Sequence, residues 1–273
     1  MMTGVPLAVT SANIALFSKS NENSLADSLV RLASGKRVNR PSDGISDFFF
    51  SEKLKRNSRD SEYILRNIED TQAFTSVAAD AGESVYNVIS DMRALVKQYY
   101  LPDTDENDRM AIAAEFNSLR DTVTGLKQSS RYDGMMVISD NGGSPFKQVV
   151  LDQYDPSVTL SVSYDDTEDI ADVTALNLGV TDEATELAAV EQELGRAGSY
   201  LAKTSAYERG LNAHYSIVQN RILTESENAD RAVEASTGEE YVAAMNKSIR
   251  SEAAYAMLAQ ANMYRTSIVR LFG

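Results

Sequence analysis

Apolar and small residues recur along this chain in steps of four and three. One run of eleven positions covers residues 64–99 without a slip, and two more cover 112–126 and 187–222. A repeat that averages about 3.5 residues keeps one face of a helix against a partner helix and is typical of a left-handed coiled coil. The pattern predicts long helices near residues 44–99, 106–129 and 183–235.

The two ends of the chain carry helical patterns as well, near residues 11–33 and 238–272. In the second of these, Val242, Met245 and Ile249 fall on one stripe, and further apolar residues fall on other faces. A helix that is apolar on more than one side needs burial on more than one side. We therefore expect both end helices to be covered by partners.

The middle of the chain follows a different period. Residues 158–164 alternate strictly between apolar and polar side chains, directly after an Asp155-Pro156 turn. This period of two predicts a β-hairpin, and residues 141–143 (Asn-Gly-Gly) predict another turn upstream. The predicted fold class is therefore mainly α: a long antiparallel helical coiled-coil rod with paired N- and C-terminal helices and a small inserted β-hairpin region.

Composition narrows the functions that the chain can have. The net charge is −14, with thirteen acids and one base, Lys147, between residues 140 and 193. That overall sign disfavours nucleic-acid binding. The chain has no cysteine, which excludes disulfides, thiolate metal sites and thiol nucleophiles. No segment approaches the roughly 20 apolar residues of a membrane span, and the first residues lack the pattern of a cleaved signal peptide.

The stretch from residue 24 to 47, SLADSLVRLASGKRVNRPSDGISD, raises the question of a phosphate-binding loop. Such a loop follows a strand and has the spacing G-x-x-x-x-G-K-[ST]. Here Gly35-Lys36 follows a predicted helix, lacks the earlier glycine and is followed by Arg37. We interpret the stretch as a joint between two helices.

Each residue of this joint suits that interpretation. Gly35 can take the left-handed conformation that ends a helix, and Pro41 prevents the helix from continuing. Ser42 or Asp43 is expected to cap the next helix.

The sequence does not indicate a catalytic or metal-binding site. Residues 103–110, DTDENDRM, resemble the start of a calcium loop, but Asp108 and Ala114 stand where that loop needs glycine and glutamate. We expect these acids to cap a helix that begins near Asn107. His214 is the only histidine, whereas zinc sites need several ligands. No nucleophile elbow of the G-x-S-x-G type occurs, so we assign no catalytic, cofactor or metal residue and expect no enzyme.

The joint and the two ends resemble bacterial flagellin, the subunit of the flagellar filament. SLADSLVRLASGKRVNRPSDG is similar to the family segment L-x-R-L-S-S-G-x-R-I-N-x-A-x-D-D, and SEKLKRNSRDSEYILRNIEDTQAFTSVAADA is similar to the next segment of the family. MLAQANMYRTSIVRLF is similar to the terminal L-A-Q-A-N-x-x-x-x-x-V-L-x-L-L. With DRMAIAAEFNSLRDTV and YDGMMVI, the resemblance covers roughly residues 11–138 and 183–272.

The resemblance implies a division into three parts. Residues 1–43 and 236–273 would form an inner terminal-helix domain, the filament core. Residues 44–139 and 183–235 would form a helical rod domain, and residues 140–182 a short acidic hairpin insert that faces solvent.

The resemblance also implies the function. The chain would self-assemble into the extracellular filament for swimming motility, after export as an unfolded chain through the flagellar type III secretion channel. Its partners would be other copies of itself, an export chaperone, the filament cap and hook-associated proteins, with no cofactor. Two alternatives stay open: a hook–filament junction protein, or a secreted coiled-coil adaptor.

Particular residues are marked by the resemblance. The positions expected at the joint and the terminal interface are Arg31, Leu32, Gly35, Arg37, Asn39, Asp43, Arg66, Asn67, Leu258, Gln260, Asn262 and Leu271. The patch by which an animal innate immune receptor recognises many flagellins corresponds to Ser90, Asp91, Arg93, Leu95 and Glu115. Many flagellins have glutamine and arginine where this chain has Ser90 and Asp91, so we expect weak recognition.

The consecutive Phe48, Phe49 and Phe50 depart from the family pattern. Three adjacent aromatic residues at the head of a helix cannot all face one core.

Overall fold

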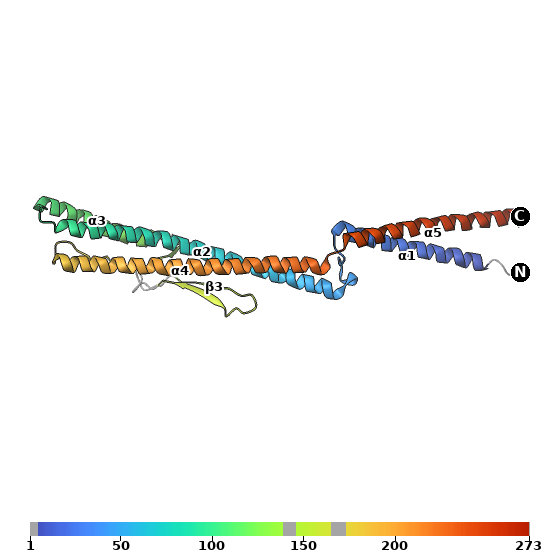
Figure 1. The fold of residues 1–273 in the computed structure, drawn as a ribbon, viewed down its shortest axis with the longest axis horizontal. Helices are drawn as coiled ribbons and strands as arrows, with labels where there is room; N and C mark the ends of the chain where they lie inside the picture. Colours follow the sequence, from blue (N-terminus) through green and yellow to red (C-terminus); the bar gives the residue numbers. More distant parts are fainter. Residues whose placement is uncertain (1–4, 139–145, 165–172, 273) are drawn as a thin grey trace. The chain divides into compact units, whose positions relative to one another are not determined.

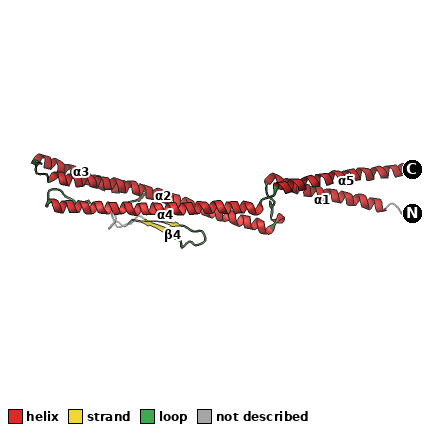
Figure 2. Cartoon of the chain, viewed as in Figure 1, coloured by secondary structure: helices red, strands yellow, loops and turns green. Residues whose placement is uncertain are grey.

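The computed structural model describes the backbone of residues 5–138, 146–164 and 173–272 (Figure 1). Within them, long helices dominate (Figure 2). Two short antiparallel sheets complete the fold. The helices are α1 (Val5–Ser34), α2 (Ile45–Tyr99), α3 (Glu106–Ser129), α4 (Glu183–Val233) and α5 (Thr237–Phe272), with a 3₁₀ turn η1 at Pro41–Asp43. The strands are β1 (Arg131–Tyr132), β2 (Met135–Met136), β3 (Phe146–Val150) and β4 (Thr159–Ser163).

The mainly α fold class is confirmed, and four of the predicted helices lie close to their expected bounds. The fifth, α1, starts at Val5 and not near residue 11, so that Pro6 occupies its second position. Proline is tolerated in the first turn because the N–H group that it lacks has no intrahelical partner there.

The chain divides into two compact units. The terminal unit comprises residues 1–56 and 224–273, and holds α1, α5 and the joint. The rod unit comprises residues 57–223, and holds α3, both sheets and most of α2 and α4.

In the rod unit, α2, α3 and α4 share one hydrophobic core. Every predicted seam position of α2 from residue 64 to 96 is buried, including Thr71 and Thr75. These two hydroxyl groups donate to backbone carbonyls of their own helix, Thr71 to Asn67 at 2.9 Å and Thr75 to Gln72 at 2.9 Å. Their polarity is therefore satisfied inside the core.

The contacts between α2 and α4 show that the two helices run antiparallel. Gln72 of α2 donates a hydrogen bond to Asn212 of α4 at 2.8 Å. Arg93, further along α2, forms an ion pair with Glu191, which lies earlier in α4, at 2.7 Å. The predicted antiparallel coiled-coil rod is therefore confirmed.

One half of α4 differs from its predicted seam. The 4-3 spacing places Leu194 and Leu201 on the seam, but Glu193 and Tyr200 are more deeply buried. Tyr200 fits because Gly82 of α2 faces it: a Cβ atom on Gly82 would lie 2.7 Å from the Tyr200 ring. A pattern of apolar letters could not predict this exchange, since it depends on the shape of the partner helix.

The predicted hairpin is present as β3 and β4, which pair antiparallel with Val149 opposite Leu160. One face is buried against the rod helices through Val149, Val162 and Tyr164. The predicted Asp155 turn is confirmed, because its carbonyl accepts a 3.0 Å hydrogen bond from the Val158 N–H group. The turn predicted at residues 141–143 lies outside the described residues.

An aromatic cluster joins the hairpin to both long helices. The Tyr164 ring lies 4.7 Å from Tyr200 of α4 and 6.2 Å from Phe74 of α2, measured between centroids. Tyr207 of α4 packs edge-on against Tyr164 at 5.8 Å, and its hydroxyl donates to the Ser163 carbonyl at 3.1 Å. Burial raises the pKa of Tyr164 to about 12.

The loop of the hairpin is attached to the same two helices. Asn57 of α2 donates to the Tyr154 hydroxyl at 2.9 Å, and Ser61 donates to Gln153 at 3.0 Å. From α4, the Arg221 guanidinium lies 6.0 Å from the centroid of the Tyr154 ring. The hairpin is thus bonded to α2 and α4 along its length.

Candidate functional site

The terminal unit is built around the pairing of α1 with α5. The residues of α1 that are buried in this pair are Ser18, Asn21 and Ser28. Those of α5 are Ala244, Ser251 and Ala254. The interface inside the chain is therefore made of small and polar side chains, which let the two backbones come close but bury little apolar surface.

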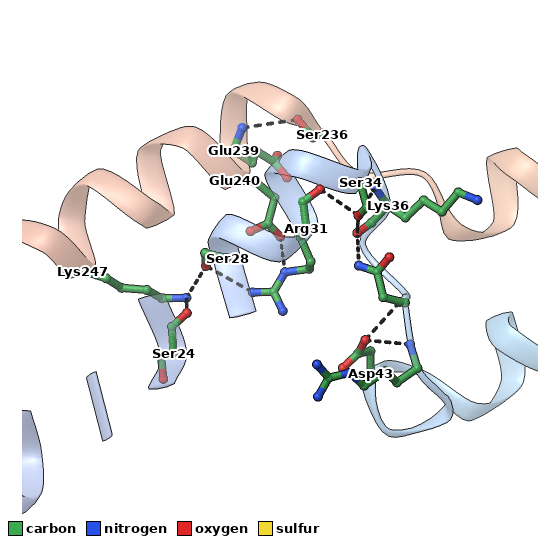
Figure 3. A network of polar contacts seen from close by, with 12 residues as sticks. Ser24, Ser28, Arg31, Ser34, Lys36, Asp43, Ser236, Glu239, Glu240 and Lys247 are labelled. Carbon is green, nitrogen blue, oxygen red and sulfur yellow. Dashed lines mark hydrogen bonds and ion pairs between the residues drawn. The ribbon is translucent and has the colours of Figure 1, made fainter. Parts of the chain in front are cut away.

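A network of polar contacts holds this interface (Figure 3). Lys247 of α5 donates to the Ser28 hydroxyl at 2.6 Å and to the Ser24 carbonyl at 3.1 Å (Figure 3). Arg31 of α1 forms a half-buried ion pair with Glu240 of α5, with 2.8 Å between Nε and Oε1 (Figure 3). Because partners late in α1 meet residues early in α5, the two helices run antiparallel.

Several large apolar residues of both helices are exposed on the outside of this pair. On α1, Phe17 is 57% exposed and Leu29 is 50% exposed. On α5, the stripe predicted from the sequence, Val242, Met245 and Ile249, is at least half exposed at every position. Large contiguous apolar surfaces are rare on soluble monomers and mark interaction sites. The terminal pair presents such a surface on both of its helices.

One part of this surface is hollowed. A groove of about 500 Å³ lies between the two helices, lined by Ile14 and Phe17 of α1 and by Ala253, Ala254 and Met257 of α5. Asn13 and Arg250 complete the lining, but most of its residues are apolar, so the groove suits an apolar side chain from another molecule.

The joint between α1 and α2 has the conformation predicted for Gly35, with a φ of +68°. The chain after it pairs with the residues that link α4 to α5: the Arg37 N–H group donates to the Val233 carbonyl at 2.7 Å. The Ala235 N–H group donates to the Gly35 carbonyl at 3.0 Å. The two connections of the terminal unit are thus bonded to each other by backbone groups.

The prediction that Asp43 caps the helix that follows it was wrong. Its carboxylate accepts hydrogen bonds from the backbone N–H groups of Asn39, at 3.0 Å, and Arg40, at 2.9 Å (Figure 3). These bonds run back into the joint and not forward onto α2, because the 3₁₀ turn folds Asp43 over the residues that precede it. The bond from Asn39, then the one from Arg40, lower the pKa of Asp43 below its ordinary value.

Several other predicted assembly residues lie in the terminal unit. Arg37 forms an ion pair with Asp47 at 2.7 Å, and the Asn39 side chain donates to the Lys36 carbonyl at 2.9 Å. Leu32 and Leu258 are half-buried, and Gln260 is exposed. The side chains of Asn262 and Leu271 are outside the described residues.

Two predicted assembly residues, Arg66 and Asn67, lie on α2 in the rod unit and not with the joint. Arg66 is exposed, while Asn67 is half-buried. The residues of the joint therefore belong to one unit and this pair belongs to the other.

The residues expected to form a receptor patch do not share one accessible surface. Ser90, Asp91 and Glu115 are exposed. Leu95, in contrast, is only 8% exposed and belongs to the rod core. Arg93 is held by two hydrogen bonds to Glu191, from Nε at 2.9 Å and from a terminal nitrogen at 2.7 Å.

The structure shows a polar contact between the hairpin and α2 that the sequence did not predict. Lys147 of β3 forms an ion pair with Asp70 of α2, and the Tyr132 hydroxyl donates to the same carboxylate. The Lys147 ammonium also lies 4.9 Å from the centroid of the Tyr132 ring. The bond from Lys147, then the one from Tyr132, lower the pKa of Asp70. The sequence feature that could have indicated this ion pair is that Lys147 is the one base among thirteen acids in residues 140–193.

Glu186, in the first turn of α4, is another carboxylate whose hydrogen bonds the sequence did not predict. Its carboxylate accepts backbone N–H bonds from Gly179 (3.0 Å), Val180 (2.8 Å) and Thr181 (2.9 Å), and a bond from the Tyr100 hydroxyl (3.1 Å). Burial raises the pKa of Glu186, but these bonds outweigh burial and the pKa lies below its ordinary value. Burial, then the bond to Glu186, raises the pKa of Tyr100 to about 12.

The acids at residues 103–110 have the capping role that was predicted. Asp105 precedes α3, and its carboxylate accepts a 2.8 Å hydrogen bond from the Asp108 N–H group. Across the described ranges, no group of three or more His, Cys, Asp or Glu side chains is placed to hold a metal ion. No helix in the described part of the chain is long and apolar enough to cross a membrane.

Comparison with known proteins identifies the family. The model of the bacterial flagellin N-terminal helical region matches residues 8–142. The chain belongs to the bacterial flagellin family. It is 25% identical over 260 residues to a flagellin of Halalkalibacterium halodurans, across 92% of this chain and 93% of that protein.

Other flagellins match over shorter lengths. A flagellin of Clostridium tyrobutyricum is 25% identical over 52% of this chain, which covers 37% of that protein. A flagellar filament 30.7 kDa core protein of Treponema maltophilum is 25% identical over 44% of this chain, which covers 42% of that protein. The crystal structure of Bacillus cereus flagellin is 18% identical, covers 59% of this chain and 88% of its own, and has a TM-score of 0.41. The names of the sequence relatives favour a filament subunit over the junction protein and the coiled-coil adaptor.

Proposed function

We propose that copies of this chain polymerise through the exposed apolar faces of α1 and α5. As a member of the flagellin family, the chain is a structural subunit of the bacterial flagellar filament. The observation that carries the proposal is that the terminal pair buries polar residues and exposes large apolar ones. Its interior holds Ser18, Asn21 and Ser28, while Phe17 and Val242 are each 57% exposed.

The energy of burial supports this surface as the one that assembles. Covering a side chain the size of valine, leucine or phenylalanine contributes about 1.5–3 kcal/mol. The terminal pair exposes at least five such residues, among them Leu16, Phe17, Leu29, Val242 and Ile249. These side chains are 50% to 68% exposed, so covering each contributes roughly half of that amount, and covering all five together reaches the lower estimates, about 4 kcal/mol, of the entropy lost when two molecules associate.

The finer assignments depend on the same surface and are part of the proposal. Residues 1–43 with 236–273 form the filament core, residues 44–139 with 183–235 form the rod, and residues 140–182 are the insert toward solvent. The apolar faces also suit an export chaperone before assembly, and the filament cap and hook-associated proteins at the filament ends. Export occurs as an unfolded chain through the flagellar secretion channel, and the absence of cysteine suits such passage.

The test replaces Val242, Met245 and Ile249 together by serine in the full chain. Because these side chains are exposed, the fold should persist by circular dichroism, while the critical concentration for polymerisation should rise at least about 10-fold, equivalent to 1.4 kcal/mol. A matched control replaces Leu101 and Met110, which are exposed in the rod unit, by serine.

Sedimentation and negative-stain micrographs measure the outcome. Long filaments are expected from the unmodified chain and from the control, and a short layer in their place would indicate the junction protein. Unchanged filaments from the triple variant would contradict the proposal.

We include weak recognition by the animal immune receptor in the proposal. Asp91 is exposed where many flagellins have arginine, and Leu95 is withdrawn into the core. A reporter-cell assay should show little signalling by the unmodified protein and a gain for Asp91→Arg with Ser90→Gln. Strong signalling by the unmodified protein, or no gain in the variant, would contradict this part.

A further inference from the structure

The aromatic run at the head of α2 exposes two of its three phenylalanine side chains. Ile45 is 67% exposed, Phe49 is 58% exposed and Phe50 is 52% exposed. Phe48 is half-buried and supports Phe49 edge-on, with 5.8 Å between ring centroids. The proposed surface on α1 and α5 does not include these residues, so they need an account of their own.

Two cations continue the same face of α2. Ile45, Phe49, Lys53 and Arg56 succeed one another in steps of four, four and three, which places them on one side of the helix. Among the described residues, the nearby acids have other partners: Asp47 pairs with Arg37 and Glu52 pairs with Lys55. Lys53 and Arg56 have no ion-pair partner within the described part of the chain. The face is apolar at its start and basic further on.

A complementary surface lies at the start of α5. A shallow groove of about 590 Å³ is lined by Ser236, Gly238, Glu239, Val242, Ala243 and Asn246. Residues 224–240, which lead into it, carry six acids and one base. Glu234 and Glu239 are both exposed, whereas Glu240 is used by the ion pair with Arg31. The groove therefore offers the apolar side chains of Val242 and Ala243 beside two exposed carboxylates, Glu239 in its lining and Glu234 two residues before the lining residue Ser236.

We infer that the Ile45–Phe49 face of α2, with Lys53 and Arg56, binds the groove at the start of α5 of a second copy of this chain. The inference rests on the proposed polymerisation and names one contact within it. Apolar residues meet apolar residues and cations meet acids, and the charges set which surface is chosen and in which register.

The geometry of such a contact suits a filament. Both surfaces belong to the terminal unit of one chain, yet Phe49 and Val242 are each more than half exposed, so neither is covered within that chain. A contact between two different surfaces is heterologous, and its repetition gives an open helical polymer unless the rotation closes a ring.

Disulfide cross-linking tests the contact, because the chain has no cysteine of its own. Phe49→Cys and Val242→Cys are made in separate chains, mixed in equal amounts, polymerised on seeds of unmodified protein and oxidised. Since each chain has one cysteine, every disulfide joins two copies. Mass spectrometry of tryptic peptides should find position 49 joined to position 242 at least ~10-fold more often than position 49 is joined to position 110 in a control mixture of Phe49→Cys with Met110→Cys, because docked residues have a high effective concentration.

Charge exchange gives a second, independent test. Lys53→Glu with Arg56→Glu, and Glu234→Lys with Glu239→Lys, should each raise the critical concentration about 10-fold when polymerised alone, since like charges then meet. An equal mixture of the two variants should polymerise as the unmodified protein does, because each face then meets an opposite charge on its neighbour.

The outcomes separate the two proposals. Normal filaments without the 49–242 disulfide, or with 49 joined only to 49, would overturn this inference and leave the proposed function standing. Normal polymerisation of both charge variants alone would do the same. No polymer from the unmodified protein would overturn both.

Discussion

The rod unit and the terminal unit differ in where their large apolar side chains lie. In the rod unit, Ile68, Phe74 and Ile89 are fully buried between helices of the same chain. In the terminal unit, the interior holds Ser28 and Asn21, and residues such as Phe17 lie outside. The rod unit therefore buries its apolar residues within the chain. The terminal pair leaves many of its apolar residues exposed, where the proposed contact with another copy would cover them. Similar helical patterns in the sequence lead to both, and the presence of a partner within the chain distinguishes them.

The sharpest comparison uses one residue type in both units. Phe74→Ala should lower the free energy of unfolding of the rod unit by about 3–5 kcal/mol, because it leaves a cavity in a closed core. Phe17→Ala should change it by less than about 0.5 kcal/mol, as expected for an exposed site. Urea unfolding of unpolymerised protein, followed by circular dichroism, measures both. Equal losses of free energy of unfolding in the two variants would contradict the claim that Phe74 is buried within the chain and Phe17 is not.

Two glycines extend the comparison to backbone packing. Gly82→Ala places a methyl group 2.7 Å from the Tyr200 ring and should cost about 1–3 kcal/mol through overpacking. Gly238→Ala, near the start of α5, meets no atom within 4 Å and should be neutral or stabilising by up to about 1 kcal/mol. Thermal unfolding of the two variants under one condition provides the measurement. A tolerated Gly82→Ala would mean that α2 and α4 are not held as closely as described.

The third test concerns a buried carboxylate of the rod and its response to pH. Glu186→Gln should cost about 1–3 kcal/mol at pH 7, because backbone N–H groups lose a charged acceptor. The pKa of Glu186 is lowered from an ordinary value of 4.5. A carboxylate with a lowered folded pKa stabilises the protein fully above its unfolded pKa and loses that contribution as the pH falls through the folded pKa.

The unmodified protein should therefore lose stability below about pH 4.5, and Glu186→Gln should lack this part of the loss. Urea unfolding of both proteins at pH 7 and at successively lower pH checks the sign. Parallel curves would show that Glu186 does not titrate as described.

The smallest expected effect concerns the terminal pair. Glu240→Gln removes the charge that pairs with Arg31, whose side chain is 22% exposed, and should cost about 1 kcal/mol. Glu227→Gln is the control, since its pair with Arg231 is largely exposed and should contribute less than about 0.5 kcal/mol. Hydrogen exchange of the α1 and α5 amides detects the difference. Equal exchange in both variants would show that the Arg31 contact does not hold the pair.

Parts of this architecture were readable from the sequence and parts were not. The seam of α2 was predictable because a sustained 4-3 spacing admits one buried face, and the hairpin because strict alternation admits one buried side. The side on which α5 is covered was not predictable, since the Val242 stripe is apolar whether its partner lies inside the chain or outside it. The Lys147–Asp70 pair joins residues far apart in the sequence, and the fold was needed to bring them together.

The hairpin attachments have a consequence for sliding between the long helices. Positions 71 to 82 of the α2 seam are small, and a smooth seam of heptads can in principle slip by one repeat with little loss of packing. The hairpin bonds to fixed points on both helices, at Asn57, Ser61 and Asp70 on α2 and at Tyr207 and Arg221 on α4. A slip would break all of these contacts at once, so the small β element adds to the direct contacts between α2 and α4 that fix the axial register of the rod.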